Sequence, residues 1–81
     1  MTVTEILNQV QTIMRDVLDN DRLEITLQTT AKDVAEWDSL AHIQLVVAIE
    51  KHFRIRFTAK ELGGFADVGD MCAGIQRRLA P

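Results

Sequence analysis

Hydrophobic residues recur at three- and four-residue steps in three stretches of the chain, and each stretch predicts an amphipathic helix. The first stretch lies near the N-terminus and is about four turns long. Thr2 or Thr4 can cap its start, and Asp19-Asn20-Asp21 is expected to end it, because these residues favour caps and turns. Its apolar positions are Val3, Ile6, Leu7, Val10, Ile13, Met14, Val17 and Leu18.

A second helix is predicted from about Ser39 to Phe53, after a long connection over residues 21–37 that has no sustained period. Thr30-Ala31-Lys32-Asp33 can form a single helical turn within this connection. Scattered apolar residues are expected to hold the connection against the helices: Leu23, Ile25, Leu27, Val34 and Trp37. A loop this long in so small a domain usually has a functional task.

The remaining chain predicts a short helix and a last long one. Arg54-Ile55-Arg56-Phe57 alternates polar and apolar residues, as an extended link does. Thr58-Ala59-Lys60-Glu61 is a capping-box pattern that opens a short helix, and Gly63-Gly64 ends it. Asp67 can cap the last helix, whose apolar stripe is Val68, Met71, Cys72, Ile75 and Leu79.

Together these elements predict an all-α fold. It is a four-helix bundle of three main helices and one short helix, with a long loop after the first helix. A chain of 81 residues has room for one core, so residues 1–81 are expected to form a single domain.

The second predicted helix carries two apolar faces. With Ser39 at zero and about 100° per residue, four positions between roughly 240° and 340° make a core stripe: Leu45, Val46, Ile49 and Phe53. Three others lie between roughly 40° and 100°: Leu40, Ile43 and Val47. Polar residues flank this second strip: Gln44, Glu50, Lys51 and Arg54. A bundle helix needs only one buried stripe, so the second strip is interpreted as a docking surface. The alternative is that it contacts the long connection or the short helix.

Composition and charge remove several function classes. The net charge is −3 and Arg77-Arg78 is the one basic cluster, which argues against a nucleic-acid binder. Cys72 is the only cysteine, and with two histidines and no metal-ligand spacing no metal site is expected.

The chain is expected to be cytoplasmic. Its longest apolar run, Leu45 to Ile49, is far too short to span a bilayer, so no stable membrane insertion is predicted. The N-terminal residues lack the basic and apolar segments of a secretory signal.

Ser39 follows Asp38 at the predicted start of the second helix. From spacing alone, both could be ordinary helix caps. No general base accompanies Ser39 in a recognisable motif, which argues against a serine hydrolase.

The segment from Trp37-Asp38-Ser39-Leu40 to Ile55 adds specific information, since it resembles the D-S-L-x-x-[VI]-x-L … L-E-x-x-F-x-I signature of acyl carrier proteins. The spacing to Phe53 and Ile55 agrees, as do the long preceding loop and the chain length. The resemblance therefore covers nearly the whole chain.

The resemblance implies a carrier protein without catalysis of its own. Ser39 would carry covalent 4′-phosphopantetheine derived from coenzyme A, with acyl cargo held as a thioester, and Asp38 would be recognised by the transferase. The phosphodiester would lie at a helix N-terminus, where the helix dipole favours an anion. The implied partners are a phosphopantetheinyl transferase and acyl ligases, acyltransferases or synthases, and a monomer is expected. The docking residues would be Leu40, Ile43, Gln44, Val47, Glu50 and Lys51.

The sequence also departs from the family pattern. Gln44 and Lys51 stand where acidic residues are common, and the charges from Asp38 to Arg54 cancel. Weak steering towards general fatty-acid enzymes is therefore predicted, which favours dedicated partners in a specialised lipid, polyketide or related pathway. Trp37 also ends a loop segment where a Leu-Gly pair is frequent, although its ring could hold the loop equally well.

Two other functions stay open. An aminoacyl carrier (D-alanyl or peptidyl) would use the same arm, and Gln44 is compatible with the D-alanyl kind. The Asp38-Ser39-Leu40 order favours acyl carriers over the Gly-Gly-x-Ser pattern of many peptidyl carriers. The other alternative is a non-carrier helical adaptor in which Ser39 only caps the helix.

Overall fold

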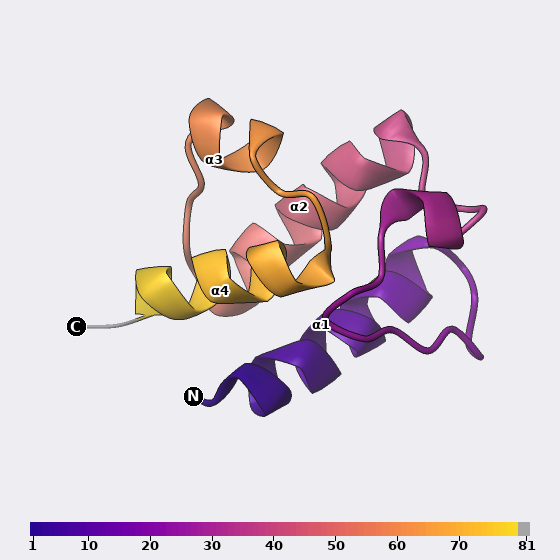
Figure 1. Ribbon diagram of the computed structural model, residues 1–81, viewed down its shortest axis with the longest axis horizontal. Coiled ribbons are helices and arrows are strands. Elements are labelled where there is room, and N and C mark those ends of the chain that lie inside the picture. Colours follow the sequence, from indigo (N-terminus) through magenta and orange to yellow (C-terminus); the bar gives the residue numbers. More distant parts are fainter. Residues whose placement is uncertain (80–81) are drawn as a thin grey trace.

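The computed structural model describes residues 1–79, and Ala80 and Pro81 of the predicted domain lie outside the described residues. The helices of the described part are α1 (Val3–Val17), the 3-10 turn η1 (Ala31–Asp33), α2 (Ser39–Phe53), α3 (Ala59–Gly63) and α4 (Val68–Leu79), and residues 1–79 contain no strand. The predicted all-α class, with three main helices and one short one, is confirmed. Helix α1 packs against α2 and α4, and α1 and α2 run in opposite directions (Figure 1).

Helix α1 begins and ends as its flanking residues predict. The Thr2 hydroxyl accepts the N–H of Glu5 at 3.1 Å, and the Glu5 carboxylate accepts the N–H of Thr2 at 2.9 Å. These hydrogen bonds from Thr2 hold the pKa of Glu5 below its usual value. At the other end, Asp19 adopts a left-handed backbone with φ 52°, which turns the chain out of the helix.

The core forms where α1, α2 and α4 meet. Its innermost side chains have almost no contact with solvent: Ile6, Val10, Met14, Leu45, Ile49, Val68, Met71, Cys72 and Ile75. Of the predicted apolar stripe of α4, four residues are buried, and Leu79 is 37% exposed. Leu79 continues the apolar stripe of α4, but it is the last residue of the helix.

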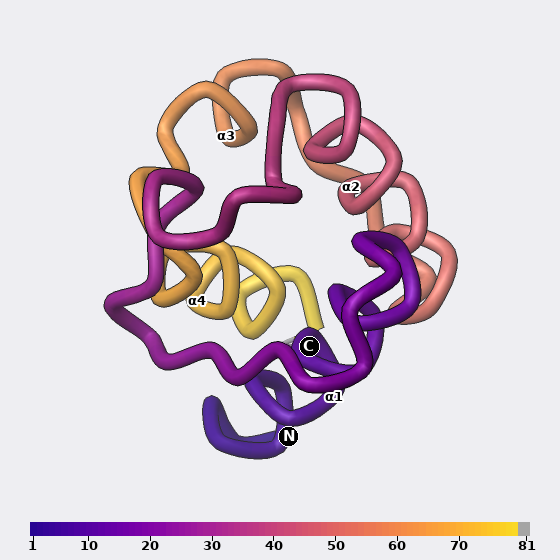
Figure 2. The backbone as a smooth tube through the Cα atoms, turned by 90° about the vertical axis from the view of Figure 1, so that its right-hand side faces the viewer, coloured from indigo at the N-terminus to yellow at the C-terminus, as the bar shows by residue number. Residues whose placement is uncertain are grey.

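The connection between α1 and α2 is held by hydrogen bonds as well as by apolar side chains. It passes along α4 before it turns towards α2 (Figure 2). The N–H of Val68 donates to the carbonyl of Thr29 at 2.9 Å, and the N–H of Gly69 donates to that of Leu27 at 2.7 Å. A Cβ on Gly69 would lie 2.8 Å from the Leu27 carbonyl oxygen, so only glycine permits this approach.

Buried side chains complete the attachment of the connection. Ile25, Val34 and Trp37 are buried, as predicted, and Leu23 and Leu27 are half-buried. Trp37 is therefore fixed immediately before α2, and the residues that follow it begin the helix at a defined place.

Candidate functional site

Ser39 is the first residue of α2, and Asp38 is the cap of this helix. The Asp38 carboxylate accepts the N–H of Ala41 at 2.8 Å, and the Asp38 carbonyl accepts the N–H of His42 at 2.9 Å. Ser39 is exposed, and its hydroxyl forms no hydrogen bond with any residue of the described part. The hypothesis that Ser39 only caps the helix is therefore wrong, since Asp38 already fills that role.

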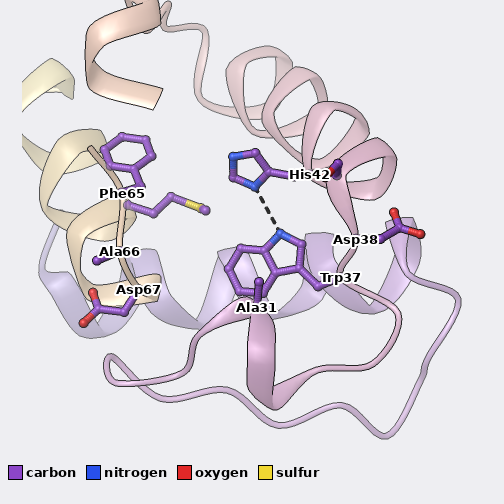
Figure 3. Close-up of a pocket in the computed structure, with 9 residues that line it drawn as sticks. Ala31, Trp37, Asp38, His42, Phe65, Ala66 and Asp67 are labelled. Atoms are coloured by element: carbon purple, nitrogen blue, oxygen red, sulfur yellow. Dashed lines mark hydrogen bonds between the residues drawn. The ribbon is translucent and has the colours of Figure 1, made fainter. Parts of the chain in front are cut away.

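A pocket of about 440 Å³ opens beside Ser39. Its walls come from three segments: the end of the α1–α2 connection, the first turn of α2, and the start of α4 with the link before it. His42 and Phe65 lie on opposite sides of it, and the Asp38 carboxylate points away from it (Figure 3). Its lining residues are Ala31, Trp37, Asp38, Ser39, His42, Phe65, Ala66, Asp67 and Met71.

Trp37 and His42, which both line the pocket, are in direct contact with each other. The indole Nε1–H donates to Nδ1 of His42 at 3.1 Å, and the two rings are stacked with their centroids 5.9 Å apart. Nδ1 of His42 is thus an acceptor for Trp37 and is not directed at Ser39. This arrangement is not that of a Ser-His nucleophile, in which the imidazole accepts the serine proton.

Phosphopantetheine fits the groups around Ser39. A phosphodiester on the hydroxyl would lie at the N-terminus of a 15-residue helix, where the helix dipole favours an anion. Capping engages the N–H groups of Ala41 and His42 but leaves those of Ser39 and Leu40 without a partner among residues 1–79. The adjacent pocket has apolar walls against which a flexible chain could lie.

The second apolar strip of α2 is exposed, as predicted. Leu40 is 66% exposed, Ile43 62% and Val47 44%, whereas all four predicted core residues of the helix are buried. The alternative, in which the strip contacts the connection or α3, is wrong. Exposure of three large apolar side chains along one helix face is typical of an interaction surface.

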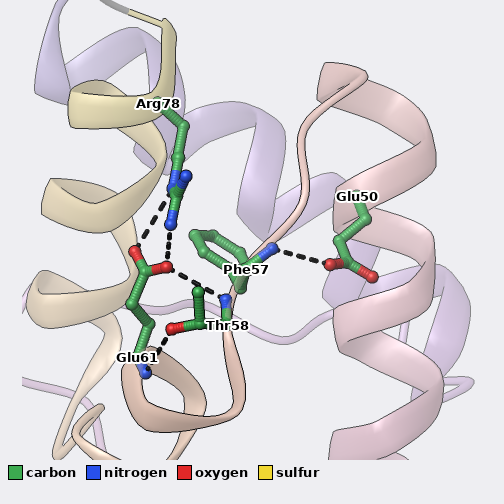
Figure 4. Close-up of polar contacts among 5 residues, drawn as sticks. All are labelled: Glu50, Phe57, Thr58, Glu61 and Arg78. Atoms are coloured by element: carbon green, nitrogen blue, oxygen red, sulfur yellow. Dashed lines mark hydrogen bonds and ion pairs between the residues drawn. The ribbon is translucent and has the colours of Figure 1, made fainter.

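The polar residues beside the strip differ in their exposure to solvent. Gln44 and Lys51 are exposed, but Glu50 is half-buried and its carboxylate accepts the N–H of Phe57 at 2.9 Å (Figure 4). This bond fixes the extended link after α2. The sequence did not indicate it, because it joins residues seven apart that no local motif connects.

Besides Glu5, two ionisable side chains outside the site have a perturbed pKa. Burial raises the pKa of the Cys72 thiol to about 11, with a smaller effect from Asp67. Arg78, followed by the backbone of Thr58, lowers the pKa of Glu61 to about 2, and Figure 4 shows these contacts. Within residues 1–79, no group of three or more His, Cys, Asp and Glu side chains is placed to hold a metal, and no helix is long and apolar enough to cross a membrane.

Comparison with known proteins adds a family to this geometry. Residues 8–75 match the family described as "Phosphopantetheine attachment site". An acyl carrier protein of an Exiguobacterium species is 34% identical over 98% of this chain and 100% of its own length. The meromycolate extension acyl carrier protein of Mycobacterium tuberculosis is 29% identical over 95% of this chain and 67% of its own. The solution NMR structure of holo acyl carrier protein from Geobacter metallireducens superposes with a TM-score of 0.87 at 36% identity, over 91% of this chain and 85% of that one.

Proposed function

This chain belongs to the acyl carrier protein family, whose members carry covalent 4′-phosphopantetheine and catalyse no reaction of their own, and we propose that Ser39 is the residue that carries the arm. The observation that carries the proposal is that two adjacent residues at the start of α2 have different roles. Asp38 caps the helix, while the exposed hydroxyl of Ser39 has no structural partner among residues 1–79.

Each group around Ser39 has a task in this proposal. The arm supplies a thiol that holds the cargo as a thioester. The N-terminus of α2 stabilises the negative charge of the phosphodiester. One carboxylate oxygen of Asp38 accepts the capping hydrogen bond from the N–H of Ala41. The other oxygen is available to contact the transferase and its bound metal ion. The docking residues of α2, all exposed except the half-buried Glu50, bring partner enzymes to the arm: Leu40, Ile43, Gln44, Val47, Glu50 and Lys51.

We further propose that the cargo is an acyl group of a specialised lipid, polyketide or related pathway, carried by a single-domain monomer in the cytoplasm. Support comes from Gln44 and Lys51, which remove negative charge from the face that meets the partner. Carriers with dedicated tasks exist among the relatives, as the name of the meromycolate extension protein states. An aminoacyl cargo would use the same serine and the same docking face.

The test is modification by coenzyme A, Mg²⁺ and a broad-specificity phosphopantetheinyl transferase, followed by intact mass spectrometry. Wild type should gain one phosphopantetheine, and Ser39→Ala should gain none. Because Asp38 is the cap, Ser39→Ala should keep its free energy of unfolding within about 0.5 kcal/mol of wild type. Attachment at any other residue would refute the proposal.

Asp38→Asn separates the two roles of the carboxylate. Asparagine caps helices about as well as aspartate, so the melting temperature should stay close to that of wild type. The amide does not bind Mg²⁺ as a carboxylate does, so the rate of modification should fall by about tenfold or more. Asp38→Ala, which loses the cap as well, should lose about 1 kcal/mol of stability in addition. An unchanged modification rate in Asp38→Asn would remove Asp38 from the recognition site.

A further inference from the structure

The docking face of α2 ends in a cluster of cations. On the helical wheel Lys51 and Arg54 fall at roughly 120° and 60°, the same side as the exposed strip of Leu40, Ile43 and Val47. They lie about 18 and 22 Å along the helix axis from Ser39. The charges from Asp38 to Arg54 cancel as a sum, but they are not evenly placed, because Asp38 lies at the arm end whereas both cations lie with Glu50 at the far end.

These cations line a shallow groove of about 510 Å³ with apolar and charged walls. Its residues are Val47, Glu50, Lys51, Arg54, Ile55 and Arg56. The one carboxylate in it, Glu50, is engaged with the N–H of Phe57 at 2.9 Å. Lys51, Arg54 and Arg56 are exposed, and within residues 1–79 the one ion pair is that of Arg78 with Glu61, in a different part of the molecule. With three cations and one carboxylate among its lining residues, the groove is net positive.

The backbone of Arg54 is unusual for a residue that has a side chain. Arg54 is the C-cap of α2 and adopts a left-handed conformation with φ 57° and ψ 48°, and the N–H of Ile55 closes the helix on the carbonyl of Glu50 at 3.1 Å. Glycine is the residue that this position favours, because any Cβ is disfavoured there. Arg54 therefore has a backbone cost that glycine at the same position would avoid.

We propose that the partner enzyme that exchanges cargo with this carrier presents acidic side chains to Lys51, Arg54 and Arg56, and that those facing Lys51 and Arg54 lie about 18–22 Å from the entrance through which the enzyme receives the arm. This proposal rests on the proposed carrier function. It gives the enzyme a surface that attracts this carrier. Enzymes with basic docking surfaces would be repelled at the same point, so the cluster also selects against wrong partners.

The test is a charge exchange with one transferase. The probe is a malonyl transferase of a general fatty acid synthase, chosen for a basic docking surface, together with a version whose docking cations are changed to glutamate. The holo carrier is used as wild type and as Arg54→Glu/Arg56→Glu, and kcat/KM for malonyl transfer is measured at low and moderate ionic strength. At low salt, kcat/KM of the wild-type carrier should be about tenfold or more higher with the acidic version of the transferase than with the basic one. For the double variant, kcat/KM should be higher with the basic version.

The matched control is Lys60→Glu/Arg77→Glu, which changes the net charge equally. These two exposed cations border a different groove, between α3 and α4. The control should keep the wild-type preference. The proposal is overturned if the control reverses the preference as the double variant does, or if wild type shows none. Mass spectrometry of the holo carrier comes first, and failure there would count against Ser39 and not against the cationic groove.

Arg54→Gly separates structure from docking. It removes the charge and relieves the left-handed backbone, so the melting temperature should stay the same or rise. Transfer from the acidic transferase should nevertheless fall by severalfold, and Arg54→Lys should restore most of it. Undiminished transfer by Arg54→Gly would mean that Arg54 does not contact the partner.

Discussion

Replacement of two isoleucines of the same helix by alanine tests the division of α2 into a core face and a docking face. Ile49 is fully buried in the core, whereas Ile43 is 62% exposed. The substitution removes the same atoms from the same type of helix interior, so intrinsic helix propensity changes equally at both positions. Any difference in stability therefore reports burial.

The expected difference is large. Removing three carbons from a close-packed site costs about 2–5 kcal/mol, because the transfer free energy is lost and a cavity remains. Ile43→Ala should stay within about 0.5 kcal/mol of wild type, since little area is removed from water there. A domain of this size has a total stability of about 4–12 kcal/mol, so Ile49→Ala loses a substantial part of it. The corresponding drop in melting temperature is about 10–30 °C.

The assay is urea and thermal unfolding, followed by far-UV circular dichroism and by the fluorescence of Trp37, the only tryptophan of the chain. Ile43→Ala should instead slow cargo transfer from a partner enzyme, while its unfolding midpoint stays in place. Equal destabilisation by the two substitutions would refute the assignment of the faces. A stable Ile43→Ala with unchanged transfer would keep the core assignment but remove Ile43 from the docking surface.

Two further predictions concern the perturbed ionisable groups. The Cys72 thiol is buried and its pKa is raised from 9.0 to about 11. A disulfide reagent at mildly alkaline pH should therefore label it slowly in the native protein and fully in denaturant. Rapid labelling of the native protein would contradict its burial. The pKa of Glu61 is lowered from 4.5 to about 2, so the stability from its pair with Arg78 is present above pH 4.5 and is lost as the pH falls towards about 2. The urea midpoint of Arg78→Gln should therefore fall less over this pH range than that of wild type, and parallel curves would show that the pair contributes nothing.

Features that depend on local sequence were predictable. Helix boundaries follow from capping residues and apolar period, so the start and end of α2 agree with the expectation. The two faces of α2 were also correct, because a wheel captures which residues share a side. Leu79 shows the limit of this reasoning. A periodic stripe states the direction of a side chain, but it does not state whether a neighbouring helix extends far enough to cover it.

Features that depend on tertiary contacts could not be read from the chain. The approach of Leu27 to Gly69 and the bond from Phe57 to Glu50 each join segments whose separation is fixed only by the packed helices. The same holds for Trp37 and His42, although their five-residue spacing across a helix start is compatible with the contact. The cap was a choice between two adjacent residues, and only the backbone geometry assigned it to Asp38.

The net charge of α2 does not describe the charge that a docked partner would meet, because the charged residues are unevenly placed along the helix. Counted along the sequence, the charges cancel and predict a carrier without electrostatic steering. In the structure, the cancelling members face different environments. Asp38 lies at the arm end, where it caps the helix, and the Glu50 carboxylate is directed to the N–H of Phe57. Lys51 and Arg54 remain exposed with Arg56, and at low ionic strength a partner that docks along α2 would sense their charge over about a Debye length. With Arg56 included, this end of the molecule has three cations against the carboxylate of Glu50, so it is cationic towards a partner although the charges from Asp38 to Arg54 sum to zero. Salt should therefore weaken the interaction with an acidic partner and relieve the repulsion from a basic one.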